Sequence, residues 1–265
     1  MKVISNFTQT YSGTLKWSPG SDCKNRDFLI DAFCKDENKI KCYNLLDMCT
    51  FNFHNMEQDH SHKLISNLKS VLPNLKGFGY NNMSFGDCIW RHLNMLKAEG
   101  VTDFLWIQDD EFFTYDNFKD FKCLFEYYKK TPDIKHINLM YHVDDYQFTN
   151  YTPSGNDIIK INTNIDLYKT TTHQIYTSPH YAMNFSSFIC DIDYFLEEMF
   201  DPNFISYLDA YQLEGGVNIK SRENNVERCL TNVNFFESFN IVGMGGSLGK
   251  SDESLHRLNE LFLES

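Results

Sequence analysis

A short apolar run, Phe104–Ile107, leads without a turn into four polar residues in a row: Gln108, Asp109, Asp110 and Glu111. An apolar run of this length predicts a buried strand, so the carboxylates are expected at the strand's carboxyl end. Open α/β sheets bind their ligands at that edge. Adjacent carboxylates repel one another, and a hard divalent cation such as Mg²⁺ or Mn²⁺ is the simplest compensation. The alternative is a solvated acidic turn in which an aspartate caps the following backbone.

Strand and helix patterns alternate along the first half of the chain. The predicted strands are Lys2–Phe7, Lys39–Leu46, Phe104–Ile107 and Lys135–Met140. The predicted helices with an apolar face are Arg26–Cys34, Ser61–Leu72 and Asn117–Lys130, the last of them capped by Asp116. Such alternation predicts an α/β fold whose sheet contains parallel strands.

The helix that precedes the acidic run has the clearest boundaries in the sequence. Ser84 is placed to cap it, with Asp87 at the third position, and Gly100 is placed to end it. Its apolar face carries Ile89, Leu93 and Leu96. The spacing therefore predicts a helix that ends directly before the acidic strand.

The second half of the chain has shorter elements. Strands are predicted at Asp157–Ile161 and Gln174–Thr177, and Asp191 is placed to cap a helix that runs to about Phe200. No repeat, low-complexity tract or proline-rich linker separates the halves. We therefore expect a single domain over 1–265.

Charge and composition narrow the possible partners. The net charge of −12 and pI near 5.1 disfavour binding to nucleic acid. A nucleotide remains compatible, because a cation held by carboxylates can bind its phosphates. No apolar stretch is long enough for a signal peptide or a membrane span. The eight cysteines include no CxxC pair. We expect a soluble, cytoplasmic protein with reduced thiols.

The block Tyr80–Phe113, YNNMSFGDCIWRHLNMLKAEGVTDFLWIQDDEFF, resembles the core of GT-A fold glycosyltransferases. In that family an asparagine- and glycine-rich loop opens a helix, and an apolar strand then ends in a DxD or DD signature. The resemblance implies a Rossmann-like nucleotide-diphospho-sugar transferase fold with a mixed central sheet and helices on both faces. Within it, residues 1–113 would form the nucleotide-binding half, and residues 114–265 the acceptor-binding half with a carboxyl-terminal lid. It also implies that Asp110 binds Mn²⁺ or Mg²⁺ together with the diphosphate of a nucleotide sugar. Gln108 departs from the usual acidic residue, so Asp109 or Glu111 would supply the second charge.

The same resemblance suggests residues for the nucleoside part of the donor. Asp47, in LLDMCT, resembles an aspartate at an early strand end that hydrogen-bonds the base or ribose. Thr8 and Gln9 follow the first predicted strand, where relatives hold the base and ribose. The alternative for Asp47 is an ordinary turn residue.

A glycine-rich segment near the carboxyl end, SLGKS, contains Lys250. It is not a Walker loop, because Met244 stands where that pattern requires glycine. Backbone amides and a lysine can still neutralise phosphate, so Lys250 is predicted to belong to a lid over the leaving diphosphate. The alternative is a flexible turn before an exposed helix.

A catalytic base is needed if the transfer inverts the sugar. Asp209 and Glu214, in YLDAYQLEGG, resemble the position of the catalytic carboxylate in inverting enzymes. The alternative is that both are acids on a helix surface. The sequence leaves inversion and retention open.

The sequence thus predicts a hexosyl- or pentosyltransferase of the small microbial or viral kind, with a UDP-sugar as first candidate donor and a glycan or glycoprotein as acceptor. A metal-dependent nucleotidyltransferase is the rival enzyme. It would require a basic, glycine-rich triphosphate loop near the first strand, for which only Gly13 and Lys16 are available. A non-enzymatic carbohydrate-binding or structural protein is the third alternative, favoured slightly by 23 phenylalanines and 15 tyrosines.

Overall fold

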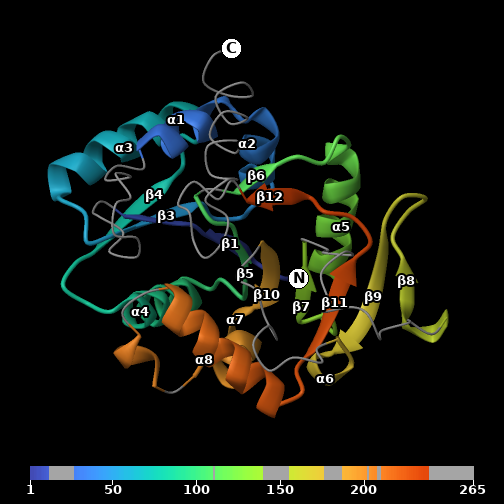
Figure 1. The fold of residues 1–265 in the computed structure, drawn as a ribbon. Coiled ribbons are helices and arrows are strands. Elements are labelled where there is room, and N and C mark those ends of the chain that lie inside the picture. The colour runs from blue at the N-terminus through green and yellow to red at the C-terminus, as the bar shows by residue number, and fades with distance from the viewer. Residues whose placement is uncertain are drawn as a thin grey trace, which may run out of the picture. The chain divides into compact units, whose positions relative to one another are not determined.

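The computed structural model describes residues 1–11, 27–109, 111–139, 155–175, 187–201, 203–207 and 210–238 of the chain (Figure 1). The chain forms two compact units, each built from segments that are distant in sequence. The first unit contains residues 1–5, 83–106 and 115–235, and the second contains residues 6–82, 107–114 and 236–265. Both units combine segments from the two predicted halves. The prediction of a single domain over 1–265 stays a prediction.

The second unit is built around a parallel three-stranded sheet. Its strands, in spatial order, are β2 (Gln9–Tyr11), β3 (Thr50–His54) and β4 (Lys76–Tyr80). The helices are α1 (Asp27–Lys35), α2 (Glu37–Tyr43) and α3 (Gln58–Val71). The central strand β3 is buried along its whole length. A two-stranded antiparallel pair, β6 (Glu111–Phe113) with β12 (Phe236–Ser238), belongs to the same unit.

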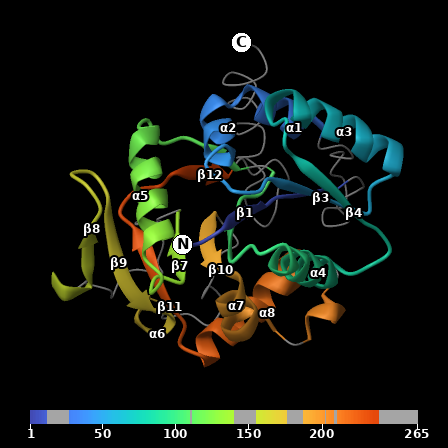
Figure 2. The same cartoon turned by 180° about the vertical axis from the view of Figure 1, so that it is seen from behind.

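Helices α1 and α3 lie side by side over the parallel sheet (Figures 1 and 2). Gly77 on β4 allows α3 to come this close, because a Cβ there would fall 2.3 Å from Cδ1 of Ile65. The predicted helices Arg26–Cys34 and Ser61–Leu72 are confirmed by α1 and α3, and α3 begins three residues earlier than expected.

The strand predicted at Lys39–Leu46 is wrong, because Glu37–Tyr43 forms the helix α2. The Asp36 carboxylate accepts a hydrogen bond of 2.9 Å from the Lys39 backbone N–H, which caps the first turn. Lys39, Cys42 and Tyr43 are buried at helical spacing. Because one of these buried residues is a lysine, the buried face of α2 does not appear as an apolar pattern in the sequence.

The first unit contains most of a seven-stranded mixed sheet. Its order is β1 (Ile4–Phe7), β5 (Asp103–Trp106), β10 (Phe188–Asp191), β7 (His136–Asn138), β11 (Glu227–Thr231), β9 (Asp166–Thr171) and β8 (Ile158–Lys160). Strand β11 runs parallel to β7, whereas β10 is antiparallel to both of its neighbours. Strands β8 and β9 form an antiparallel hairpin at one edge (Figure 2).

Helices cover both faces of this sheet, as alternate residues of β5 show. Asp103 accepts a hydrogen bond of 2.6 Å from Tyr128 on α5 (Phe118–Lys130). The next residue, Phe104, points to the opposite face, where its ring lies 5.2 Å from that of Phe195. Phe195 begins a π-helical segment that continues α7 (Ile192–Tyr194). The predicted mixed sheet with helices on both faces is therefore present.

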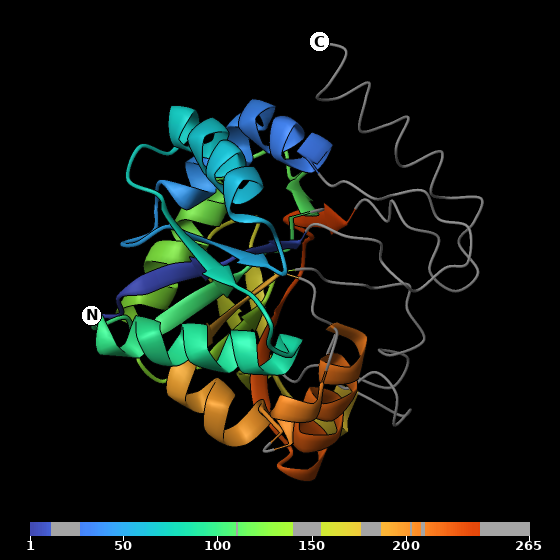
Figure 3. The same cartoon turned by 90° about the vertical axis from the view of Figure 1, so that its left-hand side faces the viewer.

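The helix predicted before the acidic strand is confirmed as α4 (Phe85–Ala98). Ser84 Oγ accepts a hydrogen bond of 3.1 Å from the Asp87 N–H, and Gly100 takes a positive φ of 83° after the helix end. Helix α4 packs beside α8 (Ala210–Glu223), as Figure 3 shows.

Two local predictions needed correction. Helix α5 is capped by Asn117, whose side chain accepts from the Lys119 N–H at 3.2 Å, and not by Asp116. The strand predicted at Gln174–Thr177 is wrong where it is described, because Thr172–Ile175 forms the short helix α6. The strand predictions at β1, β5, β7 and β8 and the Asp191 cap are confirmed.

Two further sequence expectations concern helices and thiols. Within the described ranges, no helix combines the length and the apolar character that a membrane crossing requires. The cysteines in those ranges are free thiols.

The first stability prediction concerns the buried acceptor on β5. Asp103 Oδ1 accepts from the Tyr128 hydroxyl and lies 3.4 Å from the Lys2 ammonium. Tyr128→Phe should lower the free energy of unfolding by about 1.5–3 kcal/mol, because it removes a hydrogen bond to a buried charge. Urea denaturation measures this loss. Tyr127→Phe, a half-buried neighbour on the same helix, should change it by less than about 0.5 kcal/mol; equal losses in both variants would contradict the assignment.

The second prediction concerns His92, which is buried in α4. Burial lowers the pKa of His92 to about 3, from an ordinary value of 6.5. Below pH 6.5 the unfolded chain therefore binds a proton that the folded chain excludes, and stability falls as the pH falls toward 3. His92→Gln should reduce the slope of unfolding free energy against pH by about 1.4 kcal/mol per pH unit near pH 5. Urea unfolding at several pH values tests this, with exposed His62→Gln as the control that should keep the wild-type slope.

Candidate active site

The acidic loop, residues 107–114, follows β5 in the chain and belongs to the second unit. The side chains of Asp109 and Glu111 are buried, with exposed fractions of 6% and 1%. Glu111 Oε2 accepts a hydrogen bond of 2.8 Å from the Gln108 backbone N–H, which closes a tight turn. The structure thus brings Gln108, Asp109 and Glu111 together. Asp110 lies outside the described residues.

A buried lysine on α2 holds the backbone of this loop. The Lys39 side chain is 0% exposed, and its ammonium donates to the carbonyl oxygen of Glu111. The carbonyl oxygens of Gln108 and Asp109 both lie 3.4 Å from Nζ. The ammonium also lies 4.7 Å from the ring centroid of Phe112, within cation–π range. The loop's carbonyl groups thus face a fixed positive charge.

Asp36, at the start of the same helix, holds the far end of the loop. Its Oδ2 accepts from the Phe113 N–H at 3.2 Å, while Oδ1 caps α2. Burial raises the pKa of Asp36, and the hydrogen bonds and the Lys39 charge oppose that rise. The first turn of α2 therefore contacts both ends of the acidic loop.

A second polar region lies at the carboxyl ends of β3 and β4. Asn55 and Asn82 have left-handed φ angles of 53° and 59°, which asparagine tolerates better than most residues. The Asn55 side chain accepts from the Asn82 N–H at 3.2 Å, and the Asn81 side chain accepts from the Met56 N–H at 3.1 Å. These reciprocal bonds tie the two loops together at the sheet edge where parallel α/β folds bind ligands.

Thr8 and Gln9, the residues predicted to hold base and ribose, are both buried in the second unit. The Thr8 hydroxyl is hydrogen-bonded to the Tyr43 hydroxyl and accepts from Asn6 Nδ2 at 3.0 Å. The Thr8 side chain therefore takes part in the internal packing of β1, β3 and α2. A donor contact by either residue stays a prediction.

The remaining predicted residues are spread over the chain. Asp47 is exposed in a turn between α2 and β3, and the strand whose end it was expected to occupy does not exist. Glu214 is half-buried on α8 of the first unit. Asp209 and Lys250 lie outside the described residues. The roles of all four stay predictions.

The loop's donor chemistry suits a hard cation, because its side chains offer only oxygen. Across the described ranges, no group of three or more histidine, cysteine, aspartate or glutamate residues is arranged to hold a metal ion. The described carboxylates therefore do not complete a metal site by themselves. Asp109 and Glu111 contribute at most part of one.

Sequence reasoning missed Asp36 and Lys39, which hold the acidic loop, and Asn55, which ties the loops after β3 and β4. The spacing Asp36-x-x-Lys39 is a helix-capping pattern and could have revealed α2. The contact between Lys39 and a loop some 70 residues away left no local signal.

Comparisons with known proteins address the fold. No protein-family model matches this sequence, and no curated protein matches it. Among solved structures, an apo UDP-glucose pyrophosphorylase is 10% identical over 98% of this chain and 99% of its own, with a TM-score of 0.53. A Bacillus anthracis protein described as a glucose-1-phosphate thymidylyltransferase, in complex with sucrose, is 13% identical over 98% and 95%, with a TM-score of 0.54. The chain has a nucleotide-diphospho-sugar transferase fold, and this prediction is confirmed.

The contact between Lys39 and the loop generates the third prediction. Lys39→Met keeps the apolar stem but removes the donors, so buried carbonyl groups lose their partner. The variant should lose about 2–4 kcal/mol of unfolding free energy. Hydrogen exchange should become faster at the amides of residues 108–113. Lys41→Met, at an exposed position on the same helix, is the matched control and should alter neither quantity. Unchanged exchange in the Lys39 variant would disprove the proposed support.

Proposed function

We propose that this protein is a glycosyltransferase that moves a sugar from a nucleotide-diphospho-sugar to a hydroxyl group of a glycan or glycoprotein. The acidic loop is the observation that carries the proposal. Two carboxylates, Asp109 and Glu111, are buried in a loop that directly follows a buried strand. Carboxylate oxygens are preferred ligands of hard divalent cations. A cation held at this loop could bind the diphosphate of a nucleotide sugar.

Mn²⁺ or Mg²⁺ is the proposed cofactor. Asp110 is the first candidate ligand, with Asp109 beside it. Glu111 is the weaker candidate, because its Oε2 already accepts from the Gln108 N–H. When bound, the ion would neutralise the diphosphate oxygens and stabilise the departing nucleotide. Lys39 would act by keeping the loop backbone in place.

The nucleoside would lie at the carboxyl edge of the parallel sheet β2–β3–β4. The tied asparagine loops at Asn55 and Asn82 support this placement, because they offer fixed backbone and amide groups there. Thr8, Gln9 and Asp47 remain the candidates for base and ribose contacts. A UDP-sugar is the first candidate donor, since one protein of similar fold is named for UDP-glucose.

Transfer itself would need an acceptor base or support for the leaving group. Asp209 and Glu214 are the proposed bases, and Lys250 is the proposed contact of the leaving diphosphate. A base at Asp209 or Glu214 would take the proton of the acceptor hydroxyl. The acceptor oxygen would then bond to the anomeric carbon as the nucleoside diphosphate leaves.

A nucleotidyltransferase is the second candidate, favoured by the names of both proteins of similar fold. That reaction joins a sugar phosphate to the α-phosphorus of a nucleoside triphosphate and releases pyrophosphate. A glycosyltransferase releases a nucleoside diphosphate instead. The products therefore separate the two proposals.

Donor binding is the fourth prediction. UDP-, GDP- and TDP-sugars with and without Mn²⁺ are compared by thermal shift and calorimetry. At least one should raise the melting temperature in a Mn²⁺-dependent way. Asp110→Ala should weaken binding by about tenfold or more, because a charged ligand of the metal is lost. Asp116→Ala, an exposed neighbour in the same region, should bind as the wild type does.

Product analysis completes this test. Release of nucleoside diphosphate from the bound sugar nucleotide, with no pyrophosphate formed from a nucleoside triphosphate and a sugar phosphate, would support glycosyl transfer. The opposite pattern would establish the nucleotidyltransferase. Failure of every nucleotide to bind would refute both enzymes.

A further inference from the structure

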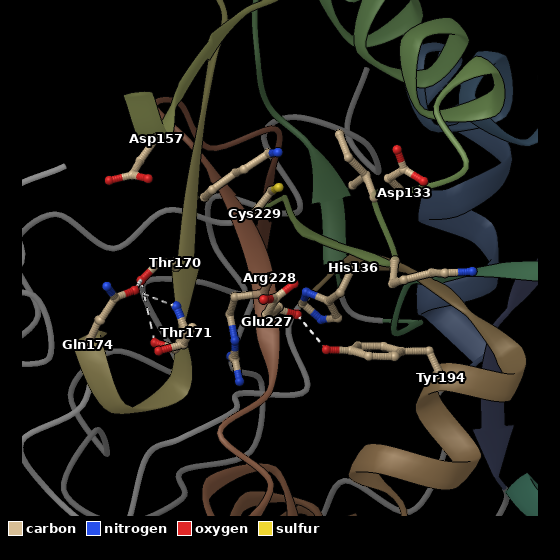
Figure 4. A pocket seen from close by; sticks show the side chains of 13 residues that line it. Asp133, His136, Asp157, Thr170, Thr171, Gln174, Tyr194, Glu227, Arg228 and Cys229 are labelled. Carbon is tan, nitrogen blue, oxygen red and sulfur yellow. Dashed lines mark hydrogen bonds between the residues drawn. The ribbon is translucent and has the colours of Figure 1, made fainter. Parts of the chain in front are cut away.

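A cavity of about 350 Å³ lies within the first unit, at the amino-terminal ends of the parallel strands β7 and β11 (Figure 4). The carboxyl-terminal end of β9, helix α6 and Tyr194 of α7 complete its wall. Open α/β folds bind substrates at the opposite, carboxyl ends of their strands. Of the residues predicted for the transferase site, none of the described ones, Thr8, Gln9, Asp47, Asp109, Glu111 and Glu214, lines this cavity.

The imidazole of His136 lines the cavity and is only 1% exposed. Its ring stacks on Phe188 at a centroid distance of 5.2 Å. Neither ring nitrogen has a hydrogen-bond partner among the residues that the structure describes. Buried polar groups are nearly always hydrogen-bonded, so an unsatisfied imidazole beside a cavity indicates a ligand or water in that space.

Arg228 lines the same cavity and is 3% exposed. Cys229 pairs with Ile137 in the parallel ladder, so the preceding residues Arg228 and His136 are neighbours on the other face. Arg228 also pairs with Thr170 across β9, and its Nη2 donates to Thr172 Oγ1 at 3.1 Å. Figure 4 shows Arg228 between Thr171 and His136.

The charges of the side chains around Arg228 and His136 favour an anion. Burial, assisted by the Arg228 charge, lowers the pKa of His136 well below its ordinary value, so the ring is neutral and offers one N–H donor. The acidic residues of the cavity lie toward solvent: Asp133 and Glu227 are exposed and Asp157 is half-buried. The Lys135 ammonium is paired with Asp191 at 2.7 Å. The buried part of the cavity therefore presents a guanidinium and an imidazole.

We propose that this cavity binds a small oxyanion, a carboxylate or a phosphate group, held by the guanidinium of Arg228 and the N–H of His136. Two oxygens of a carboxylate or a phosphate group match the fork of an arginine side chain, which can donate two parallel hydrogen bonds. The anion would also satisfy an imidazole nitrogen that has no partner among the described residues. This site is independent of the proposed transferase activity.

The test follows the Cε1–H signal of His136 by ¹H–¹³C NMR in the full-length protein. The signal is assigned by its absence in His136→Phe. Inorganic phosphate and acetate are titrated separately, and sodium chloride at matched ionic strength is the control. We expect a saturable shift with phosphate or acetate and none with chloride. The anion that binds more tightly shows whether the site prefers a phosphate or a carboxylate group. No saturable shift with either, or an equal shift with chloride, would mean a water-filled cavity and would overturn the proposal.

Two substitutions of Arg228 test whether its guanidinium donates the hydrogen bonds to the anion. Arg228→Lys keeps the charge but loses the planar fork, so binding should weaken about tenfold. Arg228→Met should abolish the saturable shift. Lys160→Met, at an exposed position of β8 that does not line the cavity, should leave the affinity unchanged. Wild-type affinity in both Arg228 variants would also overturn the proposal. If Arg228→Met does not fold, the lysine variant and the wild-type titration decide the question.

Discussion

The contact of the buried Lys39 ammonium with the backbone of the acidic loop is the interaction on which the candidate site depends. Removing an ammonium from water is costly, and three carbonyl groups of the loop, those of Gln108, Asp109 and Glu111, offset that cost. The Lys39 ammonium is a common hydrogen-bond donor to these carbonyl groups and so fixes the backbone of the loop. The loop can then present carboxylates in a buried position although they repel one another. Asp36 completes the arrangement from the same helical turn.

The second unit owes its shape to parallel pairing. Because β2, β3 and β4 all run in one direction, their carboxyl ends and the loops that follow lie along one edge. Two asparagine loops there are tied by reciprocal side-chain to backbone bonds. Left-handed φ angles at Asn55 and Asn82 allow the chain to turn sharply where it leaves the strands. Polar groups are thus fixed at the edge where a nucleotide is proposed to bind.

The first unit places buried polar side chains at the amino-terminal ends of two parallel strands. Alternation along β7 and β11 places His136 and Arg228 on one face and Ile137 and Cys229 on the other. All four residues are buried or nearly so, and His136, Arg228 and Cys229 line a cavity at the amino-terminal ends of the strands. An imidazole that is buried and has no hydrogen-bond partner in the described part of the chain is unfavourable in a purely structural role. The proposed oxyanion would supply that partner.

The sequence by itself determined the elements whose signals are local. Ser84, Asp87 and Gly100 delimited α4 because capping and a left-handed turn act within a few residues, and the run at Phe104 marked β5 because burial requires apolar side chains. The family resemblance extended this to the fold class. Only the tertiary structure decided that Lys39 lies on a helix under the acidic loop and that His136 adjoins Arg228. Both contacts join segments about 70 to 90 residues apart, and such pairings follow from chain topology, which no local pattern encodes.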